Sequence, residues 1–190
     1  MIIDKARQLV YDMLLTIGED PEREGLRDTP ARVVRAWGEW FSGYQGDPAR
    51  ILKSFEDGAE LVGDEMVVVK DIDFYSHCEH HLAPFFGKAH VAYIPVKRVV
   101  GLSKIPRVVD LFSKRLQVQE RLTNQIANAI DESLKPLGVG VVMQATHFCM
   151  CSRGVAKQGS TTITSALRGV LRTKPEARAE FMQLIVPQKY

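Results

Sequence analysis

Hydrophobic residues recur every three to four positions in the first part of the chain, and this spacing predicts α-helices. A first helix is expected over residues 3–17, ending at Gly18. Thr29-Pro30 is typical of an N-cap followed by proline in the first turn, so a second helix is expected to begin there and to stop at Gly43. Asp47-Pro48 repeats this signal for a shorter helix. The N-terminal portion is therefore predicted to be helical.

The pattern changes near residue 66, where β-branched and aromatic residues begin to alternate with polar ones. Strands are expected over residues 66–74 and 87–95, joined by a polar loop, and a second pair over 139–149 and 160–166. His90 lies inside the second strand, and we interpret it as an ordinary strand residue rather than a metal ligand.

Two helices are expected between the strand pairs and one after them. Ser103 is predicted to cap the first, the second covers about residues 118–137 and is closed by Gly138 and Gly140, and the last covers 175–186. This order of elements predicts an α+β chain with two hairpins separated by a helix pair. A sheet of four antiparallel strands has exposed edges, which favours assembly of several copies edge to edge.

The length and composition of the chain indicate a globular protein. A chain of 190 residues with 45% hydrophobic content can form one or two globular domains, and we place a boundary between a helical region, 1–65, and a second region, 66–190. The chain has no run of about eighteen apolar residues, and it does not start with a secretory signal. We therefore expect a cytoplasmic protein that does not bind a membrane.

Charge is distributed unevenly along the chain. Residues 1–65 carry 8 Lys and Arg against 14 Asp and Glu, whereas residues 66–190 carry 17 against 9. The basic second region is consistent with an anionic substrate. A solvated basic face, or a surface for the acidic region of a neighbouring subunit, explains the charge equally well.

Two short clusters contain four of the five histidines and all three cysteines. They are Ser76–His81 and His147–Cys151. Cys78 and His81 have a Cys-x-x-His spacing that lets a turn present two ligands to one ion, and Cys149 can supply a third. Three protein ligands leave the fourth tetrahedral position open, as catalytic zinc sites do.

Two other interpretations of these clusters remain open. A closed structural Cys3His site would add Cys151 to the three ligands, and a redox pair would join Cys78 to Cys149. The surplus imidazoles of His77, His80 and His147 favour the catalytic interpretation, because histidines beside a metal can transfer protons.

Lys104 and Arg107 lie in the first turn of a predicted helix. Cations oppose the helix dipole there, so their presence favours an anion site made by both side chains and the free backbone N–H groups. A phosphate group is the expected ligand.

Four motifs follow one another along the chain: Cys78-Glu79-His80-His81, Gly101-Leu102-Ser103-Lys104, Val118-Gln119-Glu120-Arg121-Leu122, and His147-Phe148-Cys149 with Arg153-Gly154. Their order and spacing resemble those of the GTP cyclohydrolase I family. The resemblance extends from Thr29-Pro30-Ala31-Arg32 to the last predicted helix.

The resemblance implies a fold and a reaction. The family has the tunnelling fold (T-fold), an antiparallel sheet with helices on one face. The sheets of several subunits join into a barrel, and the enzyme is a homo-oligomer of ten subunits with active sites at subunit interfaces. Its enzymes convert GTP and water to 7,8-dihydroneopterin triphosphate and formate, the first step towards tetrahydrofolate and tetrahydrobiopterin.

The resemblance also implies the role of individual residues. Zinc would be held by Cys78, His81 and Cys149, and His80 and His147 would act as general acid and base. Glu120 would accept two hydrogen bonds from the guanine edge. The remaining implied contacts with GTP come from Ser103 near the ribose, Gln119, Leu102, and the triphosphate-binding Lys104, Arg107, Arg153 and Arg32, the last from another subunit.

Two further functions compete with this one. A nitrile reductase of the same fold would use a cysteine nucleophile and a nicotinamide cofactor, but both Cys78 and Cys149 occupy ligand positions. A non-catalytic zinc-binding module for nucleic acid would have a closed four-ligand site and a stronger basic balance than a pI of about 8.4. We therefore expect GTP, and not nucleic acid, as the partner.

Overall fold

The computed structural model describes residues 2–55 and 65–186, and its contacts divide the chain into Met1–Ser42 and Gly43–Tyr190. The boundary inferred from the sequence lies after residue 65. Residues 43–55 instead pack with the second unit, because Leu52 is buried in its core and β1 (Ser54–Phe55) pairs with β4 (Val99–Val100). Within the described ranges, every helix is too short or too polar to cross a lipid bilayer.

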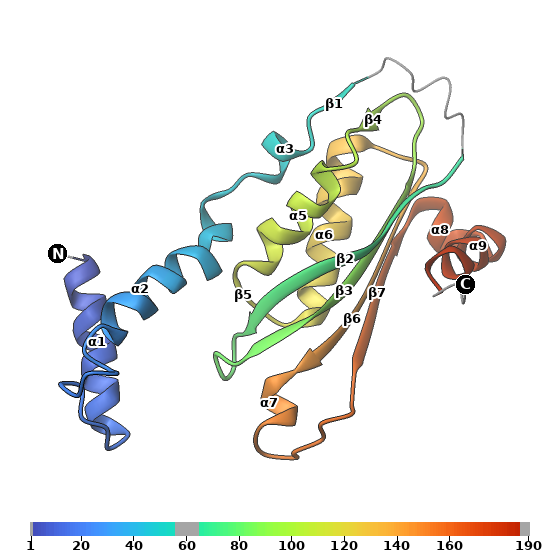
Figure 1. Cartoon of the computed structure of the whole chain (residues 1–190). Helices are drawn as coiled ribbons and strands as arrows, with labels where there is room; N and C mark the ends of the chain where they lie inside the picture. The colour runs from blue at the N-terminus through green and yellow to red at the C-terminus, as the bar shows by residue number, and fades with distance from the viewer. Residues whose placement is uncertain (1, 56–64, 187–190) are drawn as a thin grey trace. The chain divides into compact units, whose positions relative to one another are not determined.

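The N-terminal unit contains the two predicted helices, α1 (Ile2–Thr16) and α2 (Thr29–Trp40) (Figure 1). Val10 and Leu14 of α1 are buried, as expected from the helical spacing of its apolar residues. The predicted capping role of Thr29 is wrong, since Thr29 is already helical and Asp28 precedes it. Asp28 makes no side-chain cap: its own backbone is helical, with φ −90° and ψ −7°, and its carboxylate accepts a hydrogen bond from Arg32 at 3.2 Å.

The segment that follows contains short helical turns. The second helix ends at Trp40 rather than at Gly43, which lies in the 3-10 turn η1 (Ser42–Gln45). The capping prediction for Asp47 is confirmed: its carboxylate accepts a hydrogen bond of 2.9 Å from Ala49 N at the start of α3 (Pro48–Ile51).

Both predicted hairpins are present and form one sheet in the order β5-β2-β3-β6-β7. The strands are β2 (Val67–Cys78), β3 (Pro84–Ile94), β5 (Leu116–Gln117), β6 (Gly138–His147) and β7 (Thr162–Arg168). The four long strands are antiparallel, as predicted. The prediction of four strands is incomplete, because β5 adds a fifth that pairs in parallel with the end of β2.

Strand β2 has an irregularity between Val69 and Ile72. Asp71 has a φ of 59° there, and its N–H donates to Nδ1 of His90 at 3.1 Å. An extra residue in one strand leaves an unpaired backbone group. His90 satisfies that group, so its role as a strand residue rather than a ligand agrees with the structure.

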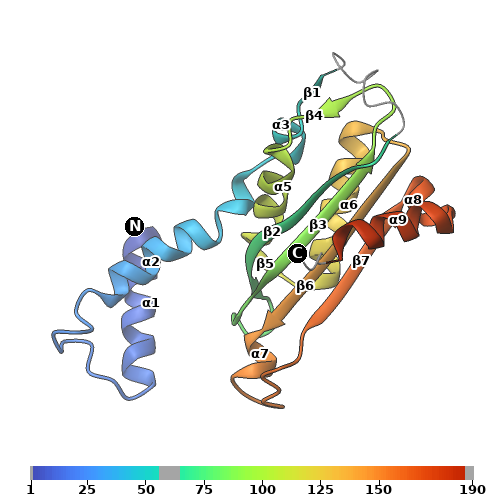
Figure 2. The same cartoon turned by 45° about the vertical axis from the view of Figure 1, so that its right-hand side comes forward.

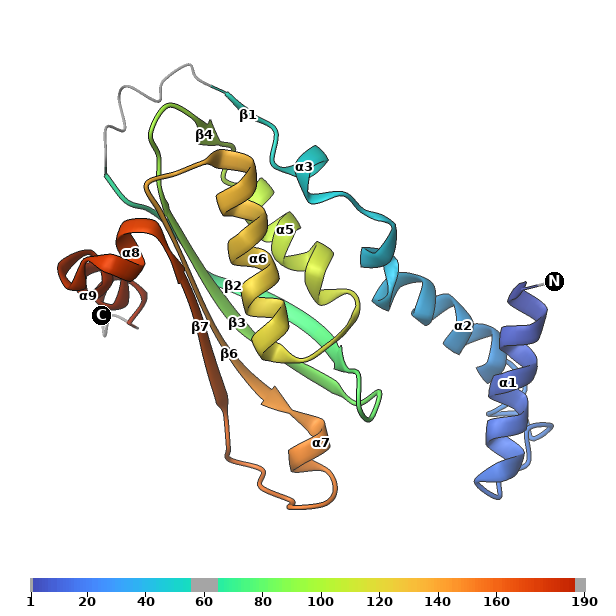
Figure 3. The ribbon, with the colours of Figure 1, turned by 180° about the vertical axis from the view of Figure 1, so that it is seen from behind.

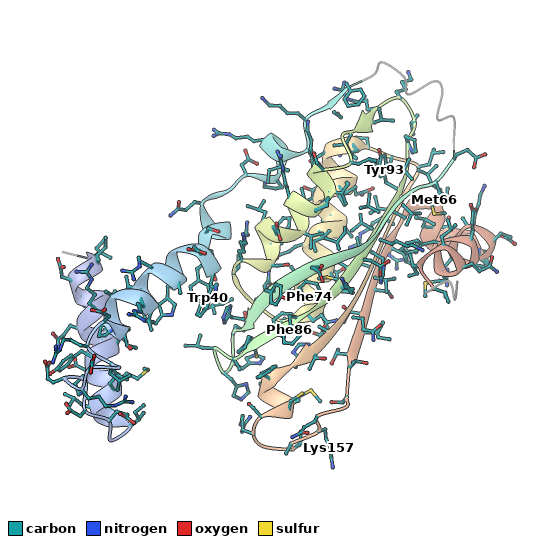
Figure 4. All side chains as sticks on the ribbon, viewed as in Figure 1. Trp40, Met66, Phe74, Phe86, Tyr93 and Lys157 are labelled. Carbon is teal, nitrogen blue, oxygen red and sulfur yellow. The ribbon has the colours of Figure 1, made fainter. Side chains whose placement is uncertain are left out.

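The larger core lies between one sheet face and the helices α5 (Lys104–Ser113) and α6 (Gln119–Leu134) (Figure 3). Phe74 and Tyr93, labelled in Figure 4, are almost completely buried in this layer. The apolar stripes of both helices face the sheet, as their sequence periodicity requires.

A smaller core lies on the opposite face of the sheet, under α8 (Gly169–Thr173) and α9 (Pro175–Ile185) (Figure 2). Leu171 and Phe181 are fully buried there. The ring of Phe181 packs where Gly140 has no side chain, since a Cβ at that position would lie 2.7 Å from it. The expectation of helices on one face only is therefore wrong for this end of the sheet.

Two predicted helix boundaries also need correction. Ser103 makes no side-chain cap, because the chain already turns before it and the N–H groups of Lys104 and Ile105 bond to backbone carbonyls. Helix α6 ends at Leu134, and Lys135, with a φ of 48°, turns the chain. Gly138 and Gly140 do not close the helix; they lie in β6.

Candidate metal centre and active site

The turn between β2 and β3 presents two of the predicted ligands. Cys78 N–H donates to Ala83 O at 2.8 Å, and Leu82 N–H returns to Cys78 O at 2.8 Å. Leu82 has a φ of 53°, which closes the turn tightly. Nδ1 of His81 consequently lies 3.9 Å from Sγ of Cys78.

Strand pairing brings the third ligand to this turn. β6 runs beside β3, with Phe85 opposite His147, and the chain then enters the short helix α7 (Phe148–Cys151). The ligand atoms of Cys78, His81 and Cys149 all lie within 4.8 Å of one another. The prediction that this turn and the end of the later strand converge is confirmed.

These three residues fit a zinc ion by their chemistry. Two sulfur donors and one imidazole are the donor types that zinc prefers. Cys78 is buried, and burial together with the neighbouring Cys78 thiol raises the pKa of Cys149. A divalent cation between the two sulfurs would remove this mutual repulsion of thiolates, so the arrangement favours a bound metal.

Cys151 does not belong to the group that can hold a metal. The described residues give a group of three ligands, and Cys151 instead has its Sγ 3.5 Å from Lys157 O and 3.9 Å from Gln158 O. Residues two apart on a helix do not share a face. All three cysteines are free thiols. The geometry therefore does not support the closed Cys3His site.

His147 lies beside the ligands at the end of β6. Its ring stacks on Phe85 with centroids 4.5 Å apart and an interplanar angle of 5°. Burial lowers the pKa of His147, and the negative charge of Glu120 partly opposes this effect. A neutral imidazole near pH 7 can accept a proton.

Gln119, the first residue of α6, is only 1% exposed. Its Oε1 lies 2.7 Å from Nε2 of His147. Its Nε2 lies 3.1 Å from each of three acceptors, which are Met143 O, Thr162 O and Thr164 Oγ1. Gln119 therefore connects the start of α6 to His147 and to strands β6 and β7.

Glu79 and Arg121 join the turn to the same helix. The Arg121 guanidinium pairs with both carboxylate oxygens of Glu79 and also donates to Gln117 Oε1 at 3.0 Å. This hydrogen-bonded cation lowers the pKa of Glu79. Nε2 of the exposed His80 lies 3.9 Å from the Glu79 carboxylate. His80 and Arg121 thus both lie beside the carboxylate of Glu79.

Arg153 and Glu120 complete the group at this end of the sheet. Nη1 of Arg153 lies 3.3 Å from Nε2 of His81 and 3.4 Å from Cys149 O. Glu120 is exposed at the start of α6, and its charge acts on His147. A cation and a carboxylate thus flank the candidate metal ligands.

The other predicted phosphate ligands lie elsewhere. Helix α5 begins beside β4 and ends before β5, whose Gln117 pairs with Cys78 (Figure 1). Ten helical residues span about 15 Å. Leu102, Ser103 and Lys104 therefore lie about one helix length from the ligands of their own chain, and Arg107 lies about one turn closer. Lys104 Nζ there donates to Lys53 O, and Arg107 is exposed.

Arg32 belongs to the N-terminal unit. Its guanidinium pairs with Asp28 at 3.2 Å on the surface of α2. Its predicted contact with a triphosphate stays a prediction.

A cavity of about 500 Å³ opens on the other face of the sheet. Its lining includes His90, Lys88 and Ile163 from the strands and Met182 from α9. It contains neither Cys78, His81 nor Cys149. This cavity is thus distinct from the candidate metal centre.

Comparison with known proteins decides the family. A family model described as GTP cyclohydrolase I matches residues 6–186. The chain belongs to this family. A GTP cyclohydrolase 1 from Nitrosospira multiformis is 55% identical over 172 residues, covering 90% of both chains. One from Dehalococcoides mccartyi is 56% identical over 181 residues, covering 94% of both.

One further relative and one solved structure were also found. The GTP cyclohydrolase 1 of Deinococcus radiodurans is 55% identical over 93% of this chain and 81% of its own. A crystal structure of the archaeosine synthase QueF-Like is 19% identical, with a TM-score of 0.46, over 55% of this chain and 93% of that chain. The latter likeness is too weak to support a conclusion.

The family prediction and the enzyme class predicted from four motifs are thus confirmed. Two contacts at the candidate site were not expected from the sequence. These are the Glu79–Arg121 pair and the stacking of Phe85 on His147. Both residues of the pair stand next to predicted site residues, Glu79 beside Cys78 and Arg121 beside Glu120, but their contact depends on the pairing of β5 with β2.

Proposed function

We propose that this chain is a zinc-dependent GTP cyclohydrolase I that converts GTP and water to 7,8-dihydroneopterin triphosphate and formate. The observation that carries the proposal is the convergence of Cys78, His81 and Cys149 beside His147 at one end of the sheet. Family membership supplies the reaction. The cytoplasmic location stays a prediction.

Cys78, His81 and Cys149 would hold the zinc ion. A zinc ion with three protein ligands supplies Lewis acidity at its open fourth position. The geometry supports an open site because Cys151 is directed towards the carbonyls of Lys157 and Gln158.

Glu120 is proposed to recognise guanine. The N1–H and 2-amino groups of guanine lie on one edge, and an ionised carboxylate can accept a hydrogen bond from each. Glu120 is exposed at the first turn of α6, next to the residue that contacts His147. Adenine lacks this pair of donors, so the same contact provides selectivity.

Proton transfer is assigned to His80 and His147. Addition of water to C8 and opening of the ring take two protons from the water and place one on N7 and one on the departing N9. His147 is half-buried and its pKa is lowered, which suits a base. His80 is exposed next to the ligand candidate His81, so its ring can reach a departing nitrogen, and we assign it the role of acid.

The triphosphate is proposed to bind between copies of the chain. Arg153 lies at the candidate metal centre, but Leu102, Ser103 and Lys104 lie about one helix length away, and Arg107 lies about one turn closer. One chain therefore does not assemble the whole predicted set. We propose that a second copy supplies these residues, that Arg32 comes from another subunit, and that the chains form a T-fold barrel of ten subunits. The open edge of β7 supports such assembly.

The test is metal content together with turnover, measured as formate release and the appearance of a pteridine chromophore. Wild-type protein should contain about one zinc per chain and release formate from GTP. His80→Ala should keep the metal and lose turnover by about 100-fold or more, the contribution of a general acid–base group. A fully metal-loaded wild type that leaves GTP intact would disprove the proposal.

A further inference from the structure

The side chain of Gln119 has an arrangement that determines the protonation pattern of His147. The amide Nε2 faces two backbone carbonyls, Met143 O and Thr162 O, each at 3.1 Å. Carbonyl oxygens only accept hydrogen bonds, so the NH2 group of the amide must point at them. The reverse orientation would place three oxygens together without a hydrogen between them.

The orientation of the amide leaves its oxygen facing His147. Oε1 lies 2.7 Å from Nε2 of the imidazole, and an amide oxygen can only accept. His147 must therefore carry a hydrogen on Nε2. In the neutral ring, one nitrogen is a donor and the other holds a lone pair, so Nδ1 is the nitrogen with the lone pair.

The surroundings hold the glutamine and the imidazole firmly in this arrangement. Thr164 Oγ1 lies 3.1 Å from Gln119 Nε2 and 2.7 Å from Thr123 Oγ1, which in turn donates to Gln119 O at 2.7 Å. Phe85 stacks on the imidazole with an interplanar angle of 5°. Gln119 and Thr123 are almost fully buried, so water does not replace these partners.

We propose that Gln119 is a positioning residue that fixes the Nε2–H tautomer of His147 and leaves Nδ1 as the nitrogen that exchanges protons with the substrate. The proposal rests on the proposed function and assigns an order to its proton transfers. Water adds across the C8–N7 double bond, and one of its protons passes to Nδ1 of His147 and from there to N7, while the imidazole keeps its Nε2–H on Gln119. When the C8–N9 bond then breaks, N9 takes a proton from His80, and the C8 hydroxyl becomes the formyl oxygen and gives up its proton, which restores His80 through water.

This role differs from the direct substrate contact that the family resemblance implied for Gln119. Its side chain is buried and both polar atoms are occupied by protein groups. A residue that contacts GTP would mainly change KM when replaced, whereas a residue that acts through His147 would change kcat.

The first measurement uses unmodified, zinc-loaded protein labelled with ¹⁵N at histidine. The ring-nitrogen shifts of His147, assigned by comparison with His147→Phe, report which nitrogen carries the hydrogen. We expect a hydrogen on Nε2 and a lone pair on Nδ1. A hydrogen on Nδ1 alone would overturn the proposal, and this result does not depend on whether GTP is turned over.

The second measurement compares Gln119→Leu with Thr164→Val. Gln119→Leu removes the acceptor for His147 and should lower kcat about 100-fold, leave KM within about twofold and produce a mixture of histidine tautomers. Thr164→Val removes one neighbour of the same amide but leaves the carbonyls of Met143 and Thr162, which alone require its orientation, so it should keep both kcat and the tautomer.

Three results would refute the role. They are an unchanged kcat in Gln119→Leu, a loss confined to KM, or an equal loss in Thr164→Val. If Gln119→Leu does not fold, the tautomer of the unmodified protein still decides. Failure of wild-type turnover with the expected tautomer would reject the proposed function while leaving the positioning of His147 intact.

Discussion

Cys149 and Cys151 are only two positions apart but differ in their surroundings, and substitutions can test this difference. Cys149 lies within 4.8 Å of the other two candidate ligands, whereas Cys151 faces the carbonyls of a loop. We expect Cys151→Ala to retain about one zinc per chain and Cys149→Ala to lose it, as measured by elemental analysis after dialysis. Equal metal loss in both variants would instead indicate a four-ligand site.

Guanine recognition by Glu120 is the second test at the level of the residue. Glu120→Ala should weaken GTP binding about 100-fold, because two hydrogen bonds to a charged acceptor are lost. Metal content should stay unchanged, since Glu120 is not among the ligands. Titration calorimetry with GTP measures the affinity.

Glu132 offers a matched control for that substitution, since it is also an exposed glutamate of α6 but lies near the opposite end of the helix. Glu132→Ala should bind GTP normally. Unchanged affinity in Glu120→Ala would show that another group reads the base.

Individual ligands were predictable from the sequence because metal-binding side chains are rare and concentrated in this chain. Cys78, His81 and Cys149 follow from the density of thiols and imidazoles in two short stretches. The orientation of Gln119 does not follow from the sequence, because it depends on the carbonyls of Met143 and Thr162 on two different strands.

At the scale of the elements, the contact between β3 and β6 sets the position of the site. Gly87 allows the close approach of the two strands, since a Cβ there would lie 1.9 Å from Gln144 O and 2.8 Å from Ala145 Cα. Gly87→Ala should lower the free energy of unfolding by roughly 1–3 kcal/mol through overpacking. Thermal unfolding at fixed protein concentration measures the loss.

The same substitution should also disturb the pairing of Phe85 with His147, two positions away along β3. Gly159→Ala is the control, because a Cβ at Gly159 would meet nothing within 4 Å. If both variants unfold at the wild-type temperature, the close approach of the strands does not limit stability.

Helices and strands were predictable as types, while their ends and minor partners were not. Apolar periodicity identified α1, α5, α6 and both hairpins. The predicted caps at Thr29 and Ser103 are absent because of local contacts. Arg32 pairs with the carboxylate of Asp28 before α2, and the N–H groups at the start of α5 bond to backbone carbonyls of an earlier turn. The short strand β5 is too brief to give a periodic signal.

For the whole molecule, the separation of Lys104 from the metal centre predicts complementation between variants. Lys104→Ala and His80→Ala should each be nearly inactive alone. If a site combines Lys104 of one chain with His80 of another, random mixed oligomers regain intact pairs in about a quarter of sites. Activity after joint refolding, measured as formate release, checks this expectation.

A mixture of His80→Ala and Glu120→Ala provides the control. His80 and Glu120 belong to the same site of one chain. His80 lies in the turn that carries Cys78 and His81, and the charge of Glu120 acts on His147 of the same chain. This mixture should remain inactive. Equal recovery in the two mixtures, or none in either, would contradict a site that divides its residues in the proposed way.

The arrangement of the whole molecule was only partly predictable. The α+β class and the antiparallel hairpins followed from the order of patterns along the chain. The position of α8 and α9 on the second face did not follow from the sequence, because their apolar residues match the pattern of any surface helix. The space beside Gly140 helps to fix where Phe181 packs, and this space is known only from the structure.

The convergence of the two clusters also concerns the unfolded chain. Cys78 and Cys149 belong to different hairpins, and 70 residues lie between them. An ion bound to both would act as a cross-link and remove the conformational freedom of that long loop. A covalent cross-link across a loop of this length is worth about 4 kcal/mol in the chain-entropy model. Binding of the ion therefore opposes unfolding in addition to any chemistry that it performs.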